Sequence, residues 1–463
     1  MSTFVDGVMD MGAGLILGPV KSDCKPVIVG IDFGTAYSGI AFAFSADPGA
    51  IQCGAPTALE PSQMKVPTAL LKLPNGEWEF GYTAEAQYNE LLMAHDPEGK
   101  VPLPGQLFKR FKMALKDKES GFETIMALSL DEKPHKLMEL ITIALQKLKD
   151  FAIQKVSTGF GGEVDPIRDI QWVLTVPAIW NEFGKAFMRK AAFKAGMINT
   201  EESDDLILVL EPEGASLAVH VGAAQFGLLG VASRFMVLDC GGGTVDITVH
   251  EVEKVEPSLS MKAIAPPTGG DWGGDYVNVK FQEFLKELVG PDLYKPTEFP
   301  LEFYAINAEF DTIKIMFDPS SEPARIRLAD VLEQRSQLIE LAATWNRNHP
   351  YIPIDLKPST RNGFLSMSNA LMTSFFEPFL AATVDETRRV LKHIPGIQCI
   401  MVVGGFGSSK ILIERIKKEF HGKDGVQVIC PDASPKPQEA ILRGAVHFGL
   451  NKGTISSRIT GSG

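Results

Sequence analysis

The chain has 463 residues, of which 45% are hydrophobic and 22% charged, an ordinary composition for a globular protein of two or three domain-sized units. Its formal net charge of −12 argues against a nucleic-acid binder, which normally carries a basic excess. No uncharged apolar run is long enough to span a membrane, the amino terminus lacks a basic leader, and the five cysteines form no CxxC pair. We therefore expect a cytoplasmic protein with reduced thiols that binds neither nucleic acid nor membrane and holds no structural zinc.

Strands and helices alternate through the first half of the chain. The predicted elements are, in order, a flexible leader (1–25), two strands joined by a glycine turn (27–44), a mostly helical region (83–156), a strand that ends at Pro177 (169–180), a helix with Asn181 as its N-cap (181–197), and a buried strand that breaks at Pro212 before a helix (206–221). These boundaries rest on local signals, such as a proline that ends a strand or an asparagine that accepts the first amide of a helix.

The second half continues the alternation. Its predicted elements are a strand–turn–strand unit (235–249), a glycine-rich turn leading into a helix (270–288), two more helices (302–318 and 368–394), a strand–turn–helix unit (398–420), a last helix (438–450) and a frayed tail (453–463). Residues 319–362 are rich in Pro, Ser, Asn and charge, and no element is assigned there. The mixture predicts an α/β fold.

Two segments share one plan: a buried strand that ends in an aspartate, a glycine turn with a threonine, and a second strand. They are VIVGIDFGTAYSGIAFAF (27–44) and FMVLDCGGGTVDITVHEV (235–252). A single hairpin of this kind is usually only a hairpin, so the second copy is what points to a ligand. The repetition predicts two related lobes that face one another.

Glycine turns at strand ends can hold phosphate, because no side chain shields their backbone N–H groups. Asp32 and Asp239 would then point into the space between the turns, where carboxylates beside a polyphosphate suit Mg²⁺. The hydroxyls of Thr35 and Thr244 could donate to phosphate oxygens. A third turn, MVVGGFGSS (401–409), lies between a strand and a helix, a layout that can aim N–H groups at a ligand. The Walker and Rossmann glycine patterns are both missing from the strand ends of this sequence.

Three of these motifs resemble the phosphate-1, phosphate-2 and adenosine motifs of the actin-like ATPase superfamily, and within it those of the 70-kilodalton heat-shock (DnaK-like) chaperones: GIDFGTAYSG, LDCGGGTVDIT and VVGGFGSSKIL. Other segments fall in the chaperone order, namely VLTVPAIWNE, LEPEGASLAV and PTGGDWGGDYVN. A further set is more similar to the divergent heat-shock 70 kDa protein 12 subgroup and its fungal relatives: GGFGSS, FKRFKMAL and SFFEPFL. The resemblance covers residues 26–452. It implies a two-lobed actin-like ATPase fold, with duplicated ribonuclease-H-like lobes around a cleft for ATP or ADP and Mg²⁺.

The resemblance also implies roles for single residues. Those implied as catalytic are Asp32, Lys112, Glu211, Asp239 and Thr244. Among them, Asp32 and Asp239 would organise the hydrated Mg²⁺, and Glu211 would help to place the attacking water. Those implied to bind the nucleotide are Gly34, Thr35, Ala36, Tyr37, Gly241, Gly242, Gly243, Asp246, Asp311, Lys314, Gly404, Gly405, Phe406 and Gly407.

Some of these assignments have alternatives. Lys109 is the second candidate for the catalytic lysine, and Lys112 itself could be a solvated helix lysine. Asp311 and Lys314 could be an i,i+3 surface pair that contributes only a few tenths of a kcal/mol. By the same resemblance, Pro177 would couple the nucleotide state to lobe movement.

Three positions depart from the chaperone pattern. Ala36 replaces a threonine of the first phosphate turn, Ser408 replaces the arginine that stacks on adenine, and Gln438 replaces an acid before the last helix. A stacked arginine contributes about 1 kcal/mol or more when desolvated, so its replacement weakens adenine binding or changes its mode. Phosphate chemistry is therefore better supported than base specificity.

The expected organisation is a leader (1–25), lobe I (26–230), lobe II (231–433), a helix that returns to lobe I (434–452) and a tail (453–463), with no peptide-binding domain. We expect a slow ATPase that works as a nucleotide-driven switch or chaperone-like accessory protein, and a partner protein that reads lobe closure. One alternative is an adaptor that binds nucleotide without hydrolysing it. A small-molecule kinase is a third possibility, although no segment matches a sugar-kinase signature.

Overall fold

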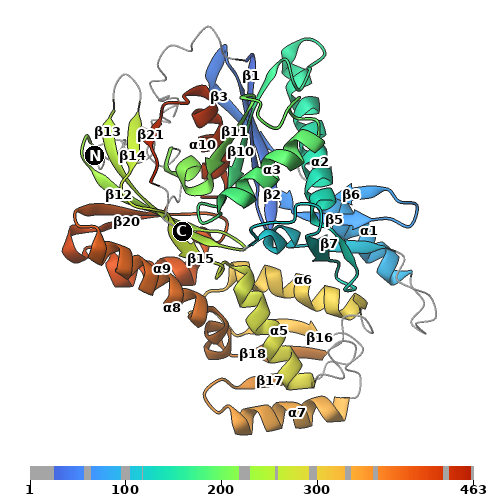
Figure 1. Cartoon of the computed structure of the whole chain (residues 1–463). Coiled ribbons are helices and arrows are strands. Elements are labelled where there is room, and N and C mark those ends of the chain that lie inside the picture. The colour runs from blue at the N-terminus through green and yellow to red at the C-terminus, as the bar shows by residue number, and fades with distance from the viewer. Residues whose placement is uncertain are drawn as a thin grey trace, which may run out of the picture.

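The computed structural model describes residues 25–56, 64–94, 105–116, 118–217, 230–255, 259–290, 300–328, 335–357, 363–430 and 437–459. These residues form a mixed α/β molecule, which confirms the predicted class (Figure 1). The leader lies outside the described residues, except for its last position. Of the helices within these ranges, none is both long and apolar enough to cross a membrane.

The first large sheet is built around the first predicted strand. Its strands are β1 (Val27–Phe33), β2 (Tyr37–Phe44), β3 (Asp47–Gly54), β4 (Val66–Pro67), β10 (Ile170–Val176) and β11 (Leu206–Leu210). Their order is β11-β10-β1-β2-β3, and β4 pairs with β2. Every residue of β1 and β10 is buried, because helices cover both faces. One face packs on α2 (Leu137–Phe160) and α3 (Glu182–Lys194), and the other on α10 (Pro437–Leu450).

The second large sheet follows the same plan. Its strands are β12 (Arg234–Cys240), β13 (Val245–Lys254), β14 (Ser260–Ala263), β15 (Thr268–Gly270), β19 (Ile397–Val403), β20 (Gln427–Ile429) and β21 (Ile455–Ser457). Their order is β20-β19-β12-β13-β14-β21, and β15 pairs with β13. One face shares an apolar core with α5 (Asp275–Val289), α8 (Asn369–His393) and α9 (Lys410–Phe420).

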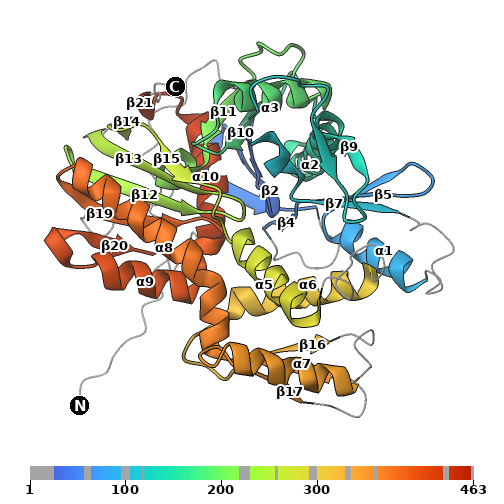
Figure 2. The same ribbon diagram turned by 60° about the horizontal axis from the view of Figure 1, so that its bottom comes forward.

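The two sheets repeat one topology. In the first, β1 is parallel to β10 and antiparallel to β2, and β10 is parallel to β11. In the second, β12 is parallel to β19 and antiparallel to β13, and β19 is parallel to β20. Helix α10 lies between the two sheets (Figures 1 and 2) and joins residues of both in one apolar cluster. The repeated motif of the sequence is therefore the central strand pair of each sheet.

Smaller elements surround these sheets. They are the strands β5 (Ala69–Lys72), β6 (Trp78–Phe80), β7 (Gln106–Lys109), β8 (Met126–Leu128), β9 (Pro134–Lys136), β16 (Ala324–Leu328), β17 (Ile354–Lys357) and β18 (Gly363–Met367), the helices α1 (Tyr82–Met93), α6 (Pro300–Met316) and α7 (Arg335–Asn348), and the 3-10 helices η1 (Phe111–Leu115), η3 (Phe406–Ser408) and η4 (Lys423–Gly425). Strands β16, β18 and β17 form one sheet in that order. Figure 2 shows α6 near α1, with α7, β16 and β17 beyond α5 and α6.

Most predicted elements are confirmed, including the helix capped by Asn181, whose side-chain oxygen accepts the N–H of Gly184 at 3.0 Å. The mostly helical reading of 83–156 is wrong over 106–136, where β7, η1, β8 and β9 lie. Strand β7 forms there because it pairs with the distant β5, and such long-range pairing overrides local pattern. Residues 211–217 are helical without a break, so Pro212 sits in the first turn of that helix, where proline is tolerated.

The tail was predicted to be frayed, and this is wrong over Ile455–Ser457. These residues form β21, which pairs in parallel with β14 at the edge of the second sheet. Residues 319–362, to which no element was assigned, contain β16, α7 and β17.

Candidate functional site

The aspartates of the repeated motif lie near the ends of the two central strands. Asp32 is the penultimate residue of β1 and lies opposite Gly39 on β2. Asp239 is the penultimate residue of β12 and lies opposite Asp246 on β13. All three aspartates are buried. The shared topology therefore places a buried carboxylate just before each glycine turn.

The two glycine turns touch one another. A Cβ atom built on Gly242 would lie 2.6 Å from the Cβ of Ala36, and one on Gly243 would lie 2.7 Å from the Thr35 hydroxyl oxygen. Such separations are too short for real carbon atoms, so only glycine fits at these two positions. The absence of side chains in the second turn is what allows the two sheets to meet at this point.

Each turn is held by a neighbouring segment. The Thr68 hydroxyl donates to the carbonyl of Gly34 at 2.8 Å, and the Thr68 N–H donates to the carbonyl of Ala36 at 2.8 Å. The three carbonyls of the second turn accept N–H groups from the residues that start α5. These bonds are Gly274 to Gly241 at 3.0 Å, Asp275 to Gly242 at 2.8 Å and Gly273 to Gly243 at 3.2 Å. Because their carbonyls are engaged in this way, the turns have a defined shape.

The carboxylate of Asp32 is fully engaged. The Lys65 ammonium contacts one oxygen, and the Thr175 hydroxyl donates to the other at 3.0 Å. Neither Lys65 nor Thr175 was predicted from the sequence. Thr175 precedes the predicted strand end at Pro177 and could have been found from that position, but no motif marks Lys65.

The carboxylate of Asp239 differs from that of Asp32 in its hydrogen bonding. Both of its oxygens are buried and have no hydrogen-bond partner among the described residues. Burial, together with the carboxylates of Glu211, Asp246 and Asp32, raises the pKa of Asp239 well above its ordinary value. A buried carboxylate without a partner is costly, and a cation is the ligand that would relieve the cost.

Glu211 and Lys112 form a buried ion pair between the strand ends. The Lys112 ammonium lies 3.0 Å from a Glu211 oxygen and donates to the backbone carbonyl of Phe33 at 2.6 Å. Burial raises the pKa of Glu211 to about 7, with Asp32 and Asp246 adding to the effect, and it outweighs the nearby ammonium. Of the two candidate lysines, Lys109 is instead paired with Glu85 at 2.7 Å.

Asp246 links the second turn to the segment after β10. Its carboxylate accepts the N–H of Ile179 at 3.0 Å, two residues beyond Pro177. Burial raises its pKa, although hydrogen bonds from Thr244 and from the backbone of this segment act in the opposite direction. The segment that contains Pro177 therefore follows a strand of the first sheet and is hydrogen-bonded to a residue of the second sheet.

We use the name acid cluster for the interacting carboxylates of Asp32, Glu211, Asp239 and Asp246. Among the residues that the structure describes, no group of three or more His, Cys, Asp or Glu side chains is arranged to ligate a metal directly. The cluster nevertheless fits a divalent cation that keeps most of its own waters, since Asp239 offers two unused oxygens.

The third glycine turn packs directly on Asp239. Gly404 has a φ of +88°, and a Cβ there would lie 2.3 Å from an Asp239 oxygen. The next residues turn away from this point, because Phe406 is buried against Phe376 and Phe379. Gly405 and Ser408, by contrast, are exposed, whereas Gly407 is buried.

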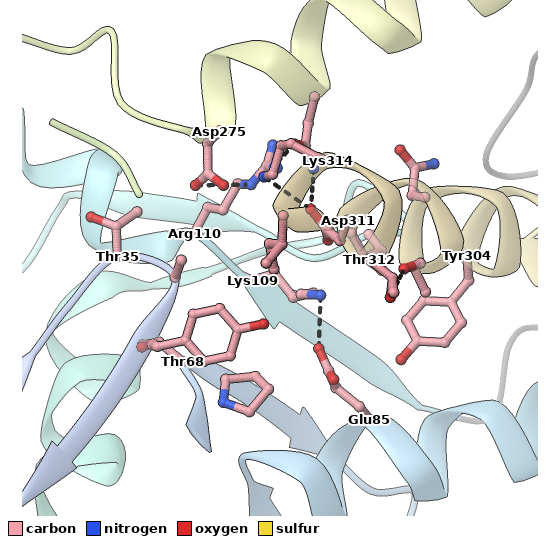
Figure 3. A pocket seen from close by; sticks show the side chains of 18 of the residues that line it. Thr35, Thr68, Glu85, Lys109, Arg110, Asp275, Tyr304, Asp311, Thr312 and Lys314 are labelled. Carbon is pink, nitrogen blue, oxygen red and sulfur yellow. Dashed lines mark hydrogen bonds and ion pairs between the residues drawn. The ribbon is translucent and has the colours of Figure 1, made fainter. Parts of the chain in front are cut away.

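A cavity of about 390 Å³ opens beside the first turn (Figure 3). Tyr37 lines it together with Thr35 and Ala36, and helix α6 supplies Asp311 and Lys314 to the opposite wall. The cavity has both polar and apolar walls, and its polar side chains and its place beside the two touching turns suit a ligand with polar groups that reach toward them.

A polar network on α5 and α6 shapes this wall. The Lys314 ammonium contacts Asp311 at 3.2 Å and donates to the side-chain oxygen of Asn278 at 2.6 Å. Burial alone would raise the pKa of Asp311, but the Lys314 and Lys109 ammonium groups outweigh it and lower that pKa. Asn278 was not predicted, although it lies in the PTGGDWGGDYVN segment that was singled out.

Ion pairs join the two halves of the chain at and near the cavity. Arg110, beside Lys109 at the end of β7, lies 3.2 Å from the Asp275 carboxylate of α5 (Figure 3). Lys116 also pairs with Asp271, at 2.5 Å. These pairs bind the segment that carries Lys112 to the segment that braces the second turn.

The predicted residues thus fall into two groups. The acid cluster, Lys112, Thr244 and the turn glycines gather where the two sheets meet, and Tyr37, Asp311 and Lys314 line the adjacent cavity. Phe406 does not face that cavity but joins the apolar core.

Comparison with known proteins gives relatives along nearly the whole chain. The chain is 28% identical over 501 residues to heat shock 70 kDa protein 12B of Homo sapiens, covering 93% of this chain and 70% of that protein. It is 28% identical over 502 residues to heat shock 70 kDa protein 12A of Mus musculus, with the same coverage. It is 24% identical over 437 residues to chaperone protein DnaK of Thermosipho melanesiensis, covering 92% of this chain and 59% of that protein. No protein-family model matches.

Proposed function

Because the homologues of this chain are members of the heat-shock 70 kDa protein family, as its motifs predicted, we propose that it binds ATP with Mg²⁺ and hydrolyses it slowly. Its role would be that of a nucleotide-driven switch or chaperone-like accessory protein in the cytoplasm. A partner protein would read the change in shape.

The proposed architecture is that of two actin-like lobes, residues 26–230 and 231–433, with residues 434–452 returning to the first. The matching order of five strands in each large sheet supports it, and so does α10, which packs on the first sheet after the chain has completed most of the second. The touching glycine turns would then lie at the base of the cleft between the lobes.

One observation carries the proposal. The carboxylate of Asp239 is buried beside three other carboxylates, and neither of its oxygens is hydrogen-bonded by any residue within the described ranges. A folded protein tolerates such a group chiefly where a ligand completes it. Mg²⁺ bound with a polyphosphate is a ligand that matches this charge, and when bound it would supply charge stabilisation at the phosphate oxygens.

The chain's own residues have complementary chemistry. The pKa of Glu211 is about 7, so its carboxyl group can both orient a water molecule and accept its proton near neutral pH. Lys112 holds a fixed position through Glu211 and the carbonyl of Phe33, from which its ammonium can stabilise negative charge that develops on a phosphate. Thr244 and the turn glycines would position the phosphates.

The switch follows from the contact between the turns. Gly242 and Gly243 pack against Ala36 and Thr35 with no space for a side chain. A phosphate group placed between these turns would force them apart, so its arrival and release would change the separation of the two sheets. Ligand occupancy would thereby be coupled to the shape that a partner reads.

A single-turnover experiment with ATP and Mg²⁺ tests the proposal. The wild-type protein should release phosphate slowly, and the Asp239→Asn variant should release it at least about a hundredfold more slowly. The comparison should be repeated with EDTA. If phosphate release is absent, or is independent of Mg²⁺ and of Asp239, the ATPase proposal is overturned.

The second candidate is an adaptor that binds nucleotide without hydrolysis. The burial of Phe406 in the core and the exposure of Ser408 favour it, because neither residue can stack on adenine as an arginine would. Tight nucleotide binding without phosphate release in the same experiment would select this function.

A further inference from the structure

Lys65 lies at an unexpected place in the acid cluster. It directly precedes β4, where Val66 pairs with Ser38 on β2, and its side chain runs along Gly39, where a Cβ would lie 3.0 Å from the Lys65 Cγ. Its ammonium contacts Asp32, and its side chain is only 12% exposed. A lysine is thus built into the end of the first central strand.

The two aspartates that the sequence predicted as equivalent metal residues are therefore in different charge environments. Asp32 already has a cation and a hydroxyl donor on its two oxygens. Asp239 has neither among the described residues. Asp32 thus has a cation in direct contact, whereas the Lys65 ammonium acts on Asp239 only from a distance, where it slightly opposes the rise in the pKa of that carboxyl.

The shape of an ammonium group makes Lys65 suitable for a second contact. It has three donors, and Asp32 needs only one of them. As a compact point charge on a flexible stem, it can turn a remaining donor toward a phosphate oxygen without leaving the carboxylate. The carbonyl of Gly34 in the adjoining turn is held by Thr68, three residues beyond Lys65. The lysine and the first turn therefore share one support.

We propose that Lys65 is a built-in cation that binds the phosphates of the nucleotide from the Asp32 side and takes over part of the charge that a metal ion would supply. This inference rests on the proposed function. It makes Lys65 a binding residue that no motif marks. It also predicts that this chain keeps appreciable affinity for a polyphosphate when divalent ions are removed.

Isothermal titration with ADP and with tripolyphosphate, each in Mg²⁺ and in EDTA, tests the inference. For the wild-type protein, removal of Mg²⁺ should weaken binding by less than about tenfold. For Lys65→Met it should weaken binding by more than about a hundredfold, because Asp32 then repels the phosphates. Lys65→Gln, which can still donate to Asp32 but has no charge, should behave like Lys65→Met. Lys185→Met is the matched control, since it removes a lysine paired with Glu182 on the surface of α3, and it should behave like the wild type.

The outcomes separate the two proposals. If the wild type binds neither ligand in Mg²⁺, the proposed function fails and the inference fails with it. If the wild type binds in Mg²⁺ but the loss in EDTA is equally large in all four proteins, only the inference about Lys65 is overturned. A change in Lys65→Met that Lys65→Gln does not share would also overturn it, because the effect would then come from packing and not from charge.

Discussion

The ends of the two central strands have the same backbone plan and opposite electrostatics. Asp32 and Asp239 each precede a glycine turn, each on the middle strand of a sheet with the same strand order. Asp32 is neutralised by Lys65 and hydrogen-bonded by Thr175, whereas neither oxygen of Asp239 has a partner in the part of the chain that the structure describes. One end is complete within the protein and contributes to its stability. The other is incomplete, and a ligand would complete it.

The difference shows what a repeated motif can and cannot determine. The repeat determines where each carboxylate lies, because strand, turn and strand are local structure. The charge of its surroundings depends on residues from elsewhere in the chain, since Lys65 reaches Asp32 from the position before β4 and Thr175 reaches it from β10. Two copies of one motif can therefore serve different purposes in the same site.

The largest expected effect comes from removing the charge at each strand end in turn. Asp32→Asn should destabilise the protein by about 3 kcal/mol, because it leaves the largely buried Lys65 ammonium without its counter-charge. Asp239→Asn should instead stabilise the ligand-free protein by about 1–2 kcal/mol, because it removes a buried carboxylate that none of the described residues hydrogen-bonds. Urea unfolding at pH 7 measures both changes. If both variants were less stable than the wild type, or both more stable, the contrast between the strand ends would be contradicted.

The pH dependence of stability tests the acid cluster independently of these two variants. Glu211 has a folded-state pKa of about 7 against an ordinary 4.5, so the folded protein holds a proton that the unfolded chain releases. The stabilisation from this proton is fully present below pH 4.5 and is lost as the pH rises through 7, by on the order of 3 kcal/mol. Glu211→Gln should lack this loss.

Thermal unfolding between pH 5 and 8 gives the measurement. The informative quantity is the difference in stability between the wild type and Glu211→Gln at each pH, because other titrating groups cancel in it. The variant should become more stable relative to the wild type as the pH rises. A flat difference, or movement in the other direction, would show that the Lys112 ammonium outweighs burial.

The contact between the third turn and Asp239 gives a smaller effect. Gly404→Ala forces a side chain onto a residue with a φ of +88° and onto an oxygen of Asp239. We expect a loss of about 2 kcal/mol from backbone strain and displacement of the carboxylate. Gly405→Ala is the matched control, since a Cβ there has no atom within 4 Å. Equal stability of the two variants would mean that Asp239 moves without cost.

Much of the fold could be predicted from the sequence, because its signals are local. Buried strands, the glycine turns and the Asn181 cap all depend on residues within a few positions of each other. The region 106–136 was misread because β7 is a strand only through its pairing with the distant β5. The strand in the tail was missed for the same reason, since it forms on the edge that β14 provides.

The candidate site was predictable to a similar extent. The motifs led to the acid cluster and the turns, but not to Lys65, whose contact with Asp32 bridges 33 positions of sequence. The burial of Phe406 depends on aromatic side chains of α8, which no feature of the third turn reveals. A motif therefore does not reveal those residues of a site that come from other parts of the chain.

The smallest expected effect concerns the ion pair that joins the two strand-end regions. Arg110, which precedes η1, pairs across the cavity with Asp275, whose N–H braces the second turn. Both side chains are partly exposed, so Arg110→Gln should cost less than about 1 kcal/mol in stability.

The larger consequence should be kinetic, because the pair closes the cavity wall over a bound ligand. Release of a fluorescent ADP analogue in stopped flow should be about two- to fivefold faster, with binding affinity changed by no more than the same factor. Raising the salt concentration should speed release from the wild type and leave Arg110→Gln nearly unchanged, since an exposed pair is screened. Equal salt responses in the two proteins would show that Arg110 does not hold the halves together and that the strand ends are coupled only through the touching turns.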